Sequence, residues 1–187
     1  IPLATLGVFI LWMGWFGFNG GSQLALGSGA DATAVADIFV NTSLAAAGGV
    51  LACMIVSKVT NSHTNIAATL NGAIAGLVAI TAEPLTPSMG QAIVIGAIGG
   101  IICMYGMKLL DMLKIDDVVM AIPAHLFAGI WGTLAVAWTN PDASLVTQFI
   151  GVIAYGFFTL IASLIVWTLI KMTIGIRATK EDEEYGL

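Results

Sequence analysis

The amino-acid sequence predicts an all-α protein, a polytopic bundle of transmembrane helices, and three observations carry this prediction. Hydrophobic residues make up 58% of the chain and charged residues only 9%, whereas a soluble domain has about 25% charged residues. The mean hydropathy is strongly positive, at +0.98. The apolar residues fall into six long runs, each close to the roughly 20 residues that a helix needs to cross a bilayer.

Six spans are expected, with turn-rich stretches between them. The predicted spans are residues 2–20, 36–57, 64–82, 89–110, 118–138 and 146–172. The longest of the predicted turn regions is 20–37. Asn140-Pro141-Asp142, between the last two spans, is a turn-initiating sequence.

The spans divide the chain into two parts. Residues 1–172 are predicted to form the membrane domain, and residues 173–187 to begin a polar tail. The chain opens on an apolar run at Ile1, without a basic leader, a cleavage site or an initiator Met, so no signal peptide is expected. We therefore expect the chain to be a piece of a longer protein.

The charged residues predict the orientation of the spans. If six spans alternate across a membrane, every basic residue falls on one side: Lys58, Lys108, Lys114, Lys171, Arg177 and Lys180. The loops on the other side contain acidic residues and neither Lys nor Arg. Because cytoplasmic loops are enriched in Lys and Arg, the shared side is predicted to be cytoplasmic. The protein is thus expected to be a multi-pass protein of the cell membrane with a cytoplasmic C-terminal tail.

Several classes of function are disfavoured by what the spans lack. All eleven acidic residues fall in loops, at span ends or in the tail, so neither a carboxylate relay nor a catalytic carboxylate pair is expected at membrane depth. Cys53 and Cys103 have no His or Cys at ligand spacing, which argues against a metal site. We therefore predict no cofactor, no metal and no enzymatic activity. The net charge of −5 comes mostly from loops and tail and does not indicate a nucleic-acid partner.

Glycines spaced four residues apart are expected to allow close approach between helices. The pairs are Gly17–Gly21, Gly72–Gly76 and Gly96–Gly100. Small residues at this spacing are typical of helix interfaces in membranes. We interpret most of them as packing residues.

A graded stripe of side chains lies at the end of the first span. Leu11, Trp15, Phe18 and Ser22 recur at offsets of four, three and four residues, which places them on one face if the helix extends that far. Aromatic faces attract a cation, and a Ser hydroxyl accepts a hydrogen bond from an N–H donor. The stripe therefore suits a site that recruits a small cation from outside. The alternative is an aromatic belt at the membrane interface.

His125 is the only charged or readily charged side chain that the sequence places inside a span rather than near its ends. Such a group is costly at membrane depth and indicates a functional site. Ala121, Ala128, Gly129 and Gly132 are predicted to share its helical face, which would leave open space beside the imidazole, as in a pore wall. The alternative is a structural histidine bonded to a neighbouring helix.

Other polar side chains lie at depth or near span ends. These are Asn41, Asn71 and Thr81. Hydrogen bonding between helices is the role first expected of them, and Thr81 is also a candidate residue of the pore or substrate site.

Four sequence motifs, spread in order over essentially the whole chain, resemble those of the ammonium transporter (Amt/Mep/Rh) family. Gly14–Ser22 (GWFGFNGGS) resembles its GWFGFNxGS motif, and Asn71–Thr81 its NGxLAGLVxIT helix. Asp116-Asp117, His125 and the stretch Gly129–Thr133 resemble its DD…H…GxxGT region. Gly175–Arg177 with Glu183–Leu187 resembles the start of its cytoplasmic tail.

The resemblance implies a fold and a set of roles. The family fold has two five-helix repeats of opposite orientation and a final long helix, assembled as trimers; this chain resembles the second repeat with the last helix. Phe18 resembles the inner aromatic gate, and Trp15 and Ser22 the outer recruitment region. His125 resembles the second of two paired pore histidines. Family tails meet PII-type regulatory proteins, which makes such a protein an expected partner.

The function implied is transmembrane transport of ammonium or ammonia. An ammonium-sensing membrane receptor module of the same fold is the alternative. A membrane enzyme with His125 as a base is a third interpretation, which the lack of a second catalytic group at depth disfavours.

Overall fold

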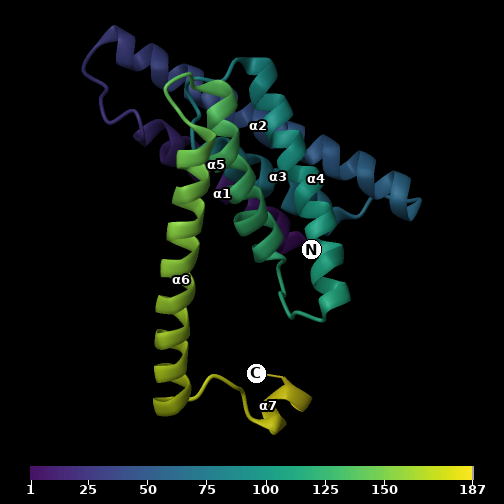
Figure 1. Cartoon of the computed structure of the whole chain (residues 1–187). Coiled ribbons are helices and arrows are strands. Elements are labelled where there is room, and N and C mark those ends of the chain that lie inside the picture. The colour runs from purple at the N-terminus through teal and green to yellow at the C-terminus, as the bar shows by residue number, and fades with distance from the viewer. Residues whose placement is uncertain (187) are drawn as a thin grey trace. The chain divides into compact units, whose positions relative to one another are not determined.

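The computed structural model describes residues 1–186, and every regular element in that range is helical (Figure 1). The elements are α1 (Pro2–Gly21), α2 (Gly29–Asn61), α3 (Ile66–Thr81), α4 (Met89–Leu113), the π-helix η1 (Ile122–Phe127), α5 (Ala128–Thr139), α6 (Leu145–Thr173) and α7 (Lys180–Tyr185). The predicted all-α membrane bundle is confirmed. The chain forms two compact units, one from Ile1 to Gln148 and one from Phe149 onward.

Side-chain caps set where α2 and α4 begin. The hydroxyl of Ser28 accepts from the backbone N–H of Asp31, whose carboxylate accepts from the Ser28 N–H, and Ser88 with Gln91 caps α4 in the same way. Such reciprocal caps satisfy N–H groups that a helix start leaves unpaired. Helix α2 therefore begins at Gly29, so the predicted turn 20–37 was too long. Hydropathy identifies only the apolar part of α2, whereas the cap at Ser28 determines where the helix begins.

Helix α3 is shorter than predicted, at 16 residues. It rises only about 24 Å at 1.5 Å per residue, less than the roughly 30 Å hydrocarbon core of a bilayer. Among the described residues, five other helices are long and apolar enough to cross a membrane: Pro2–Gly21, Gly29–Thr60, Met89–Leu113, Ile122–Thr139 and Leu145–Thr173. Most residues of α3 are buried, so its neighbours rather than lipid surround it.

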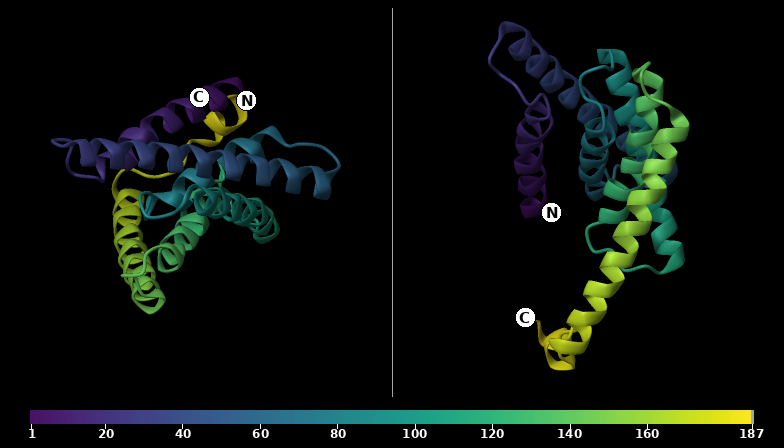
Figure 2. Two further views of the ribbon diagram at one scale, coloured as in Figure 1. Left: turned by 90° about the horizontal axis from the view of Figure 1, so that it is seen from above. Right: turned by 60° about the vertical axis from the view of Figure 1, so that its left-hand side comes forward.

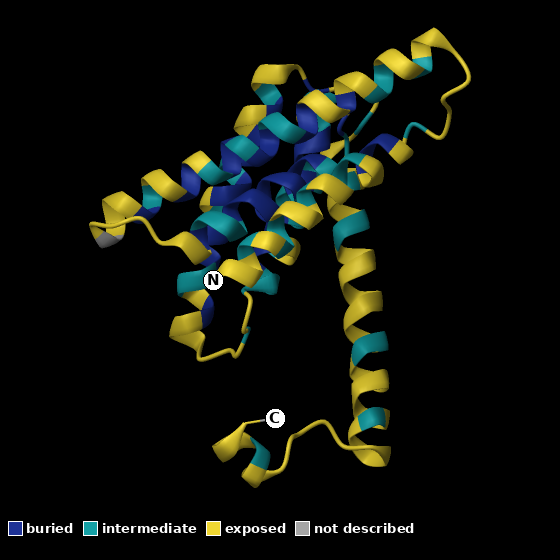
Figure 3. Cartoon of the chain, turned by 180° about the vertical axis from the view of Figure 1, so that it is seen from behind, coloured by how far each residue is buried: buried dark blue, intermediate teal, exposed yellow. Residues whose placement is uncertain are grey.

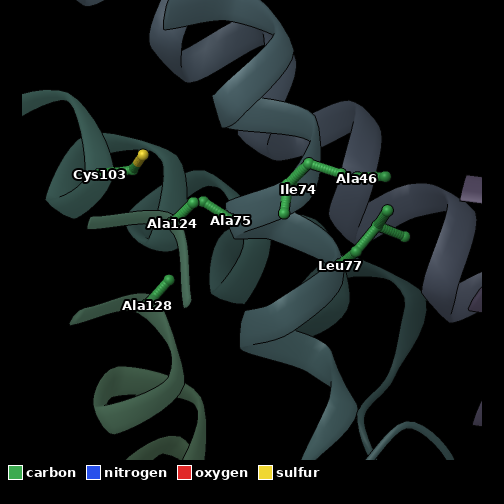
Figure 4. Packing of buried hydrophobic residues seen from close by; sticks show 7 residues of the cluster. All are labelled: Ala46, Ile74, Ala75, Leu77, Cys103, Ala124 and Ala128. Atoms are coloured by element: carbon green, nitrogen blue, oxygen red, sulfur yellow. The ribbon is translucent and has the colours of Figure 1, made fainter. Parts of the chain in front are cut away.

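The core of the first unit lies where α2, α3 and α4 pack together. Buried residues gather there (Figure 3), and one cluster joins α2, α3, α4, η1 and α5 through small side chains such as Ala46, Ala75 and Ala128 (Figure 4). A Cβ on Gly49 would collide with the backbone of Gly72, and one on Gly96 with Ala45. The glycines of α3 and α4 thus pack at helix interfaces as predicted, whereas Gly17 and Gly21 have nothing within 4 Å of an added Cβ.

The fifth predicted span, 118–138, does not begin as a regular helix. Residues 118–120 form a turn, in which Met120 has a left-handed backbone (φ 57°). The helix starts with η1, where hydrogen bonds reach one residue further than in an α-helix, and becomes α-helical at Ala128. Pro123 lacks the N–H that a regular helix interior would use. Hydropathy does not distinguish these three conformations.

The second unit consists of most of α6 and the tail, and the views in Figure 2 show both elements. No residue of α6 is buried in the structure, which suits an apolar helix whose side chains face lipid. In the tail, Thr179 and Asp182 form a reciprocal cap on the short α7, and Arg177 pairs with Glu183 at 2.6 Å. The last residue of the predicted tail, Leu187, lies outside the described residues.

Candidate functional site

The aromatic stripe lies on α1, which extends through Gly21, so the helix does continue as the stripe requires. Ser22 follows it with helical dihedral angles (φ −68°, ψ −12°). The rings of Trp15 and Phe18 meet edge to face, with centroids 5.8 Å apart. Leu11 and Phe18 are exposed, at 51% and 64%. Leu11 and Phe18 therefore present large apolar side chains that the described residues leave mostly uncovered.

Trp15 is the member of the stripe that is tied to the core. Its indole N–H donates to the Thr81 hydroxyl at 2.7 Å, and the Thr81 hydroxyl donates to the Leu77 carbonyl one turn earlier in α3. Both residues are half-buried. Thr81 thus bonds α3 to α1, the role first expected of it, and in doing so fixes the ring beside Phe18.

Ser22 keeps hydrogen-bonding capacity at the end of the stripe. Its hydroxyl donates to the Phe18 carbonyl at 3.3 Å, and its side chain is exposed. Because a hydroxyl has one donor and two acceptor lone pairs, this bond leaves the lone pairs free. An N–H donor that reaches Ser22 would also meet the Phe18 ring, one helical turn away.

His125 lies in the middle of η1, and its side chain is exposed. Its imidazole forms no hydrogen bond with residues 1–186, so the described chain offers no partner for a purely structural histidine. Of the small residues expected on its helical face, Ala128 and Gly132 are buried, with Gly132 packed on α3, whereas Ala121 and Gly129 are half-buried. The wider turn of η1 changes the spacing at which side chains share a face, so the shared face stays a prediction.

The stripe and His125 lie on different elements that pack on one apolar cluster. Ala124 and Ala128, which flank His125, belong to the cluster in Figure 4. Val8, Trp12 and Trp15 of α1 pack against the same cluster. No contact joins His125 to the stripe among the described residues, but both project from one small scaffold.

Two polar residues with defined contacts were not predicted. Asn19 is fully buried and donates to the Thr42 hydroxyl at 3.0 Å, while its own Oδ1 has no partner. Asp117 accepts from two backbone N–H groups at the start of η1. Asn19 stands within the first motif and Asp117 within the third, so their positions were visible, but their contacts depend on neighbouring elements and on the turn.

The helical architecture and the long apolar segments define a multi-pass membrane protein. The model of the Ammonium Transporter Family matches residues 1–187. The chain therefore belongs to this family.

Named relatives agree with the family assignment. A putative ammonium transporter (sll1017) of Synechocystis sp. is 41% identical over 191 residues, which cover 100% of this chain and 43% of the relative. Ammonium transporter Amt2 of Archaeoglobus fulgidus is 38% identical over 210 residues, again 100% of this chain and 43% of the relative. The chain thus spans less than half the length of these relatives.

Solved structures show the same fold. A structure described as a sensor Amt protein superposes with a TM-score of 0.90 at 34% identity, over 99% of this chain and 47% of that one. The crystal structure of Candida albicans Mep2 superposes with a TM-score of 0.84 at 26% identity, over 95% of this chain and 43% of that one.

Proposed function

We propose that this chain forms part of a transporter that moves ammonium or ammonia across the cell membrane. Family membership supports the substrate class. The observation that carries the mechanism is the exposed imidazole of His125, which has no hydrogen-bond partner in the described chain and projects from a π-helix. Wide turns of this kind occur frequently at functional sites.

The outer end of α1 recruits the ion. Phe18 offers an exposed aromatic face and Ser22 offers free lone pairs within one turn. The ring attracts a cation, by up to about 2 kcal/mol when the site is dry, and the hydroxyl accepts one of its N–H groups. Trp15, held by Thr81, supports the Phe18 ring, while Leu11 begins the apolar stretch below.

Ammonia, rather than the intact ion, crosses the apolar stretch. Moving a bare ammonium ion into hydrocarbon would cost on the order of tens of kcal/mol. The ion therefore releases one proton to water or to a pore imidazole, and neutral ammonia moves on. A neutral imidazole has one N–H donor and one acceptor nitrogen, so His125 can bond ammonia and release it without a fixed charge.

The assembly and orientation follow the same proposal. The protein is a homotrimer in the lipid bilayer, and its basic loops and C-terminal tail lie in the cytoplasm, as the distribution of Lys and Arg supports. There the tail can meet a PII-type regulatory protein. Trimers and this partner are features that the family resemblance implies.

Uptake into liposomes tests the proposal. The full-length protein that contains this chain is reconstituted, and uptake of radiolabelled methylammonium is followed against protein-free liposomes. We expect saturable uptake that ammonium inhibits. Uptake no faster than in protein-free liposomes would overturn a transport function.

Ammonium sensing is the second candidate, because the superposition with a TM-score of 0.90 is to a protein described as a sensor. A sensor needs to bind ammonium at the stripe but need not move it. Ammonium binding by the reconstituted protein, measured by calorimetry, together with no methylammonium uptake would favour the sensor.

A further inference from the structure

We propose that Asp117 is a positioning residue, whose carboxylate fixes the start of η1 and thereby the direction in which the His125 imidazole projects. Its Oδ1 accepts from the Ala121 N–H at 2.9 Å and its Oδ2 from the Ile122 N–H at 2.7 Å. Both oxygens therefore bind the first turn of the element that carries His125. This inference rests on the proposed role of His125 in transport.

The backbone hydrogen bonds at this helix start are fully accounted for. A helix leaves its first four N–H groups without partners inside the helix. Here the Asp117 carboxylate accepts hydrogen bonds from the N–H groups of Ala121 and Ile122. Pro123 has no N–H group, and the Ala124 N–H donates to the Met120 carbonyl at 3.3 Å. Removing the carboxylate would leave two half-buried donors unpaired.

A tight turn places the carboxylate over the helix start. The Met120 N–H donates to the Asp117 carbonyl at 3.1 Å, and the left-handed backbone of Met120 (φ 57°) reverses the chain. The negative charge then lies at the positive end of the helix dipole, where an anion is stabilised. Val118 and Val119, between them, are exposed at 90% and 68%, so apolar packing does not hold the turn.

The opposite side of η1 is held by packing on α4. A Cβ on Gly106 would lie 2.6 Å from the Phe127 ring and 3.0 Å from the Pro123 ring, so this glycine lets both rings approach closely. Pro123 and Ala124 are buried, while His125 is exposed. One side of η1 is packed on α4, and the start of η1 is hydrogen-bonded to Asp117. Together these contacts set the direction of the His125 imidazole.

Asp116 provides a matched control for Asp117. It is the preceding residue, it is exposed, and its carboxylate forms no hydrogen bond within the described residues. Asp116→Asn and Asp117→Asn remove the same charge from neighbouring positions. Only the second also replaces one acceptor oxygen by an NH₂ group that faces an N–H donor.

The test compares these variants in the full-length protein, reconstituted in liposomes. Methylammonium uptake is measured together with the ¹⁵N resonances of the His125 imidazole, assigned by their loss in His125→Ala. We expect Asp117→Asn to slow uptake about fivefold, in line with the loss of one of its two hydrogen bonds, and to shift the resonances. Asp116→Asn should change neither quantity, and Asp117→Glu, which keeps both oxygens, should restore most of the uptake.

Unchanged uptake and unchanged resonances in Asp117→Asn would overturn the positioning role. If Asp117→Asn does not fold, Asp117→Ser, which keeps one acceptor oxygen and places no NH₂ group against an N–H donor, takes its place, and wild-type behaviour of that variant overturns the role equally. Failure of the proposed function is distinguishable, because it would appear as wild-type uptake no faster than in protein-free liposomes, whereas failure of the role of His125 would appear as unchanged uptake in His125→Ala. The resonances report on Asp117 independently of transport.

Discussion

Two faces of the first unit use similar residues in opposite environments. Where α2, α3 and α4 meet, an added Cβ on Gly49 or Gly96 would strike a neighbouring backbone, and the surrounding alanines are fully buried. On α1, Gly14, Gly17 and Gly21 have nothing within 4 Å of an added Cβ, and Phe18 is 64% exposed. The first face is fully covered by helices of the described chain and forms a packed core. The second face and His125 carry the groups that suit a substrate or a further partner.

The largest effect is expected in the packed core. Gly49→Ala places a methyl group against the Gly72 carbonyl, and backbone atoms cannot move aside as a flexible side chain can. We expect a loss of about 3 kcal/mol in the free energy of unfolding, at the upper end for overpacked sites. Thermal unfolding of the full-length protein in detergent measures it. A variant as stable as the wild type would show that α2 and α3 can separate without cost.

A smaller effect is expected at the exposed ring. Phe18→Ala removes the aromatic face beside Ser22, and we expect the KM for methylammonium to rise about tenfold, which corresponds to roughly 1.4 kcal/mol. Phe158→Ala, at an exposed position of α6, is the matched control and should leave the KM unchanged. Equal KM values for the two variants would show that Phe18 does not take part in ion recruitment.

The hydrogen bond from Trp15 of α1 to Thr81 of α3 should contribute less to the free energy of unfolding. Trp15→Phe and Thr81→Val each delete one partner of the 2.7 Å hydrogen bond. A double-mutant cycle on the free energy of unfolding should give a coupling of about 1 kcal/mol, the usual net value of such a bond. A coupling indistinguishable from zero would mean that Thr81 does not hold the ring in place.

The smallest effect is expected on the open side of α1. Gly17→Ala adds a methyl group that meets nothing in the described chain, and Ala is the better helix former by up to about 1 kcal/mol. The full-length protein should therefore unfold at the same or a slightly higher temperature. A clear loss of stability would show that this face is tightly packed in the full-length protein.

The sequence predicts the fold well because long apolar runs and glycine spacing are local signals. It predicts helix limits less well, since the start of α2 depends on the cap made by Ser28 with Asp31, several residues before the apolar run. Trp15, Phe18 and Ser22 could be placed on one helix by spacing alone. The bond from Trp15 to Thr81 could not, because it joins residues 66 positions apart.

The surroundings of His125 were the least predictable part. A regular α-helix would place Ala121, Ala128, Gly129 and Gly132 on the face of the imidazole. Pro123 and the left-handed Met120 change the local geometry, and both are compatible with several backbone conformations when only the sequence is known. The backbone around His125 therefore contains a turn and a π-helix that no periodic pattern encodes.

Uptake by His125→Ala tests the central claim most directly. The full-length variant is reconstituted beside the wild type and His63→Ala, the same substitution in an exposed turn residue, and initial rates of methylammonium uptake are compared at equal amounts of folded protein. We predict that the His125→Ala variant loses at least nine-tenths of the wild-type rate, a tenfold change that corresponds to about 1.4 kcal/mol, while the His63→Ala variant keeps it. A wild-type rate and KM in His125→Ala would contradict the claim that the imidazole lines the path of ammonia.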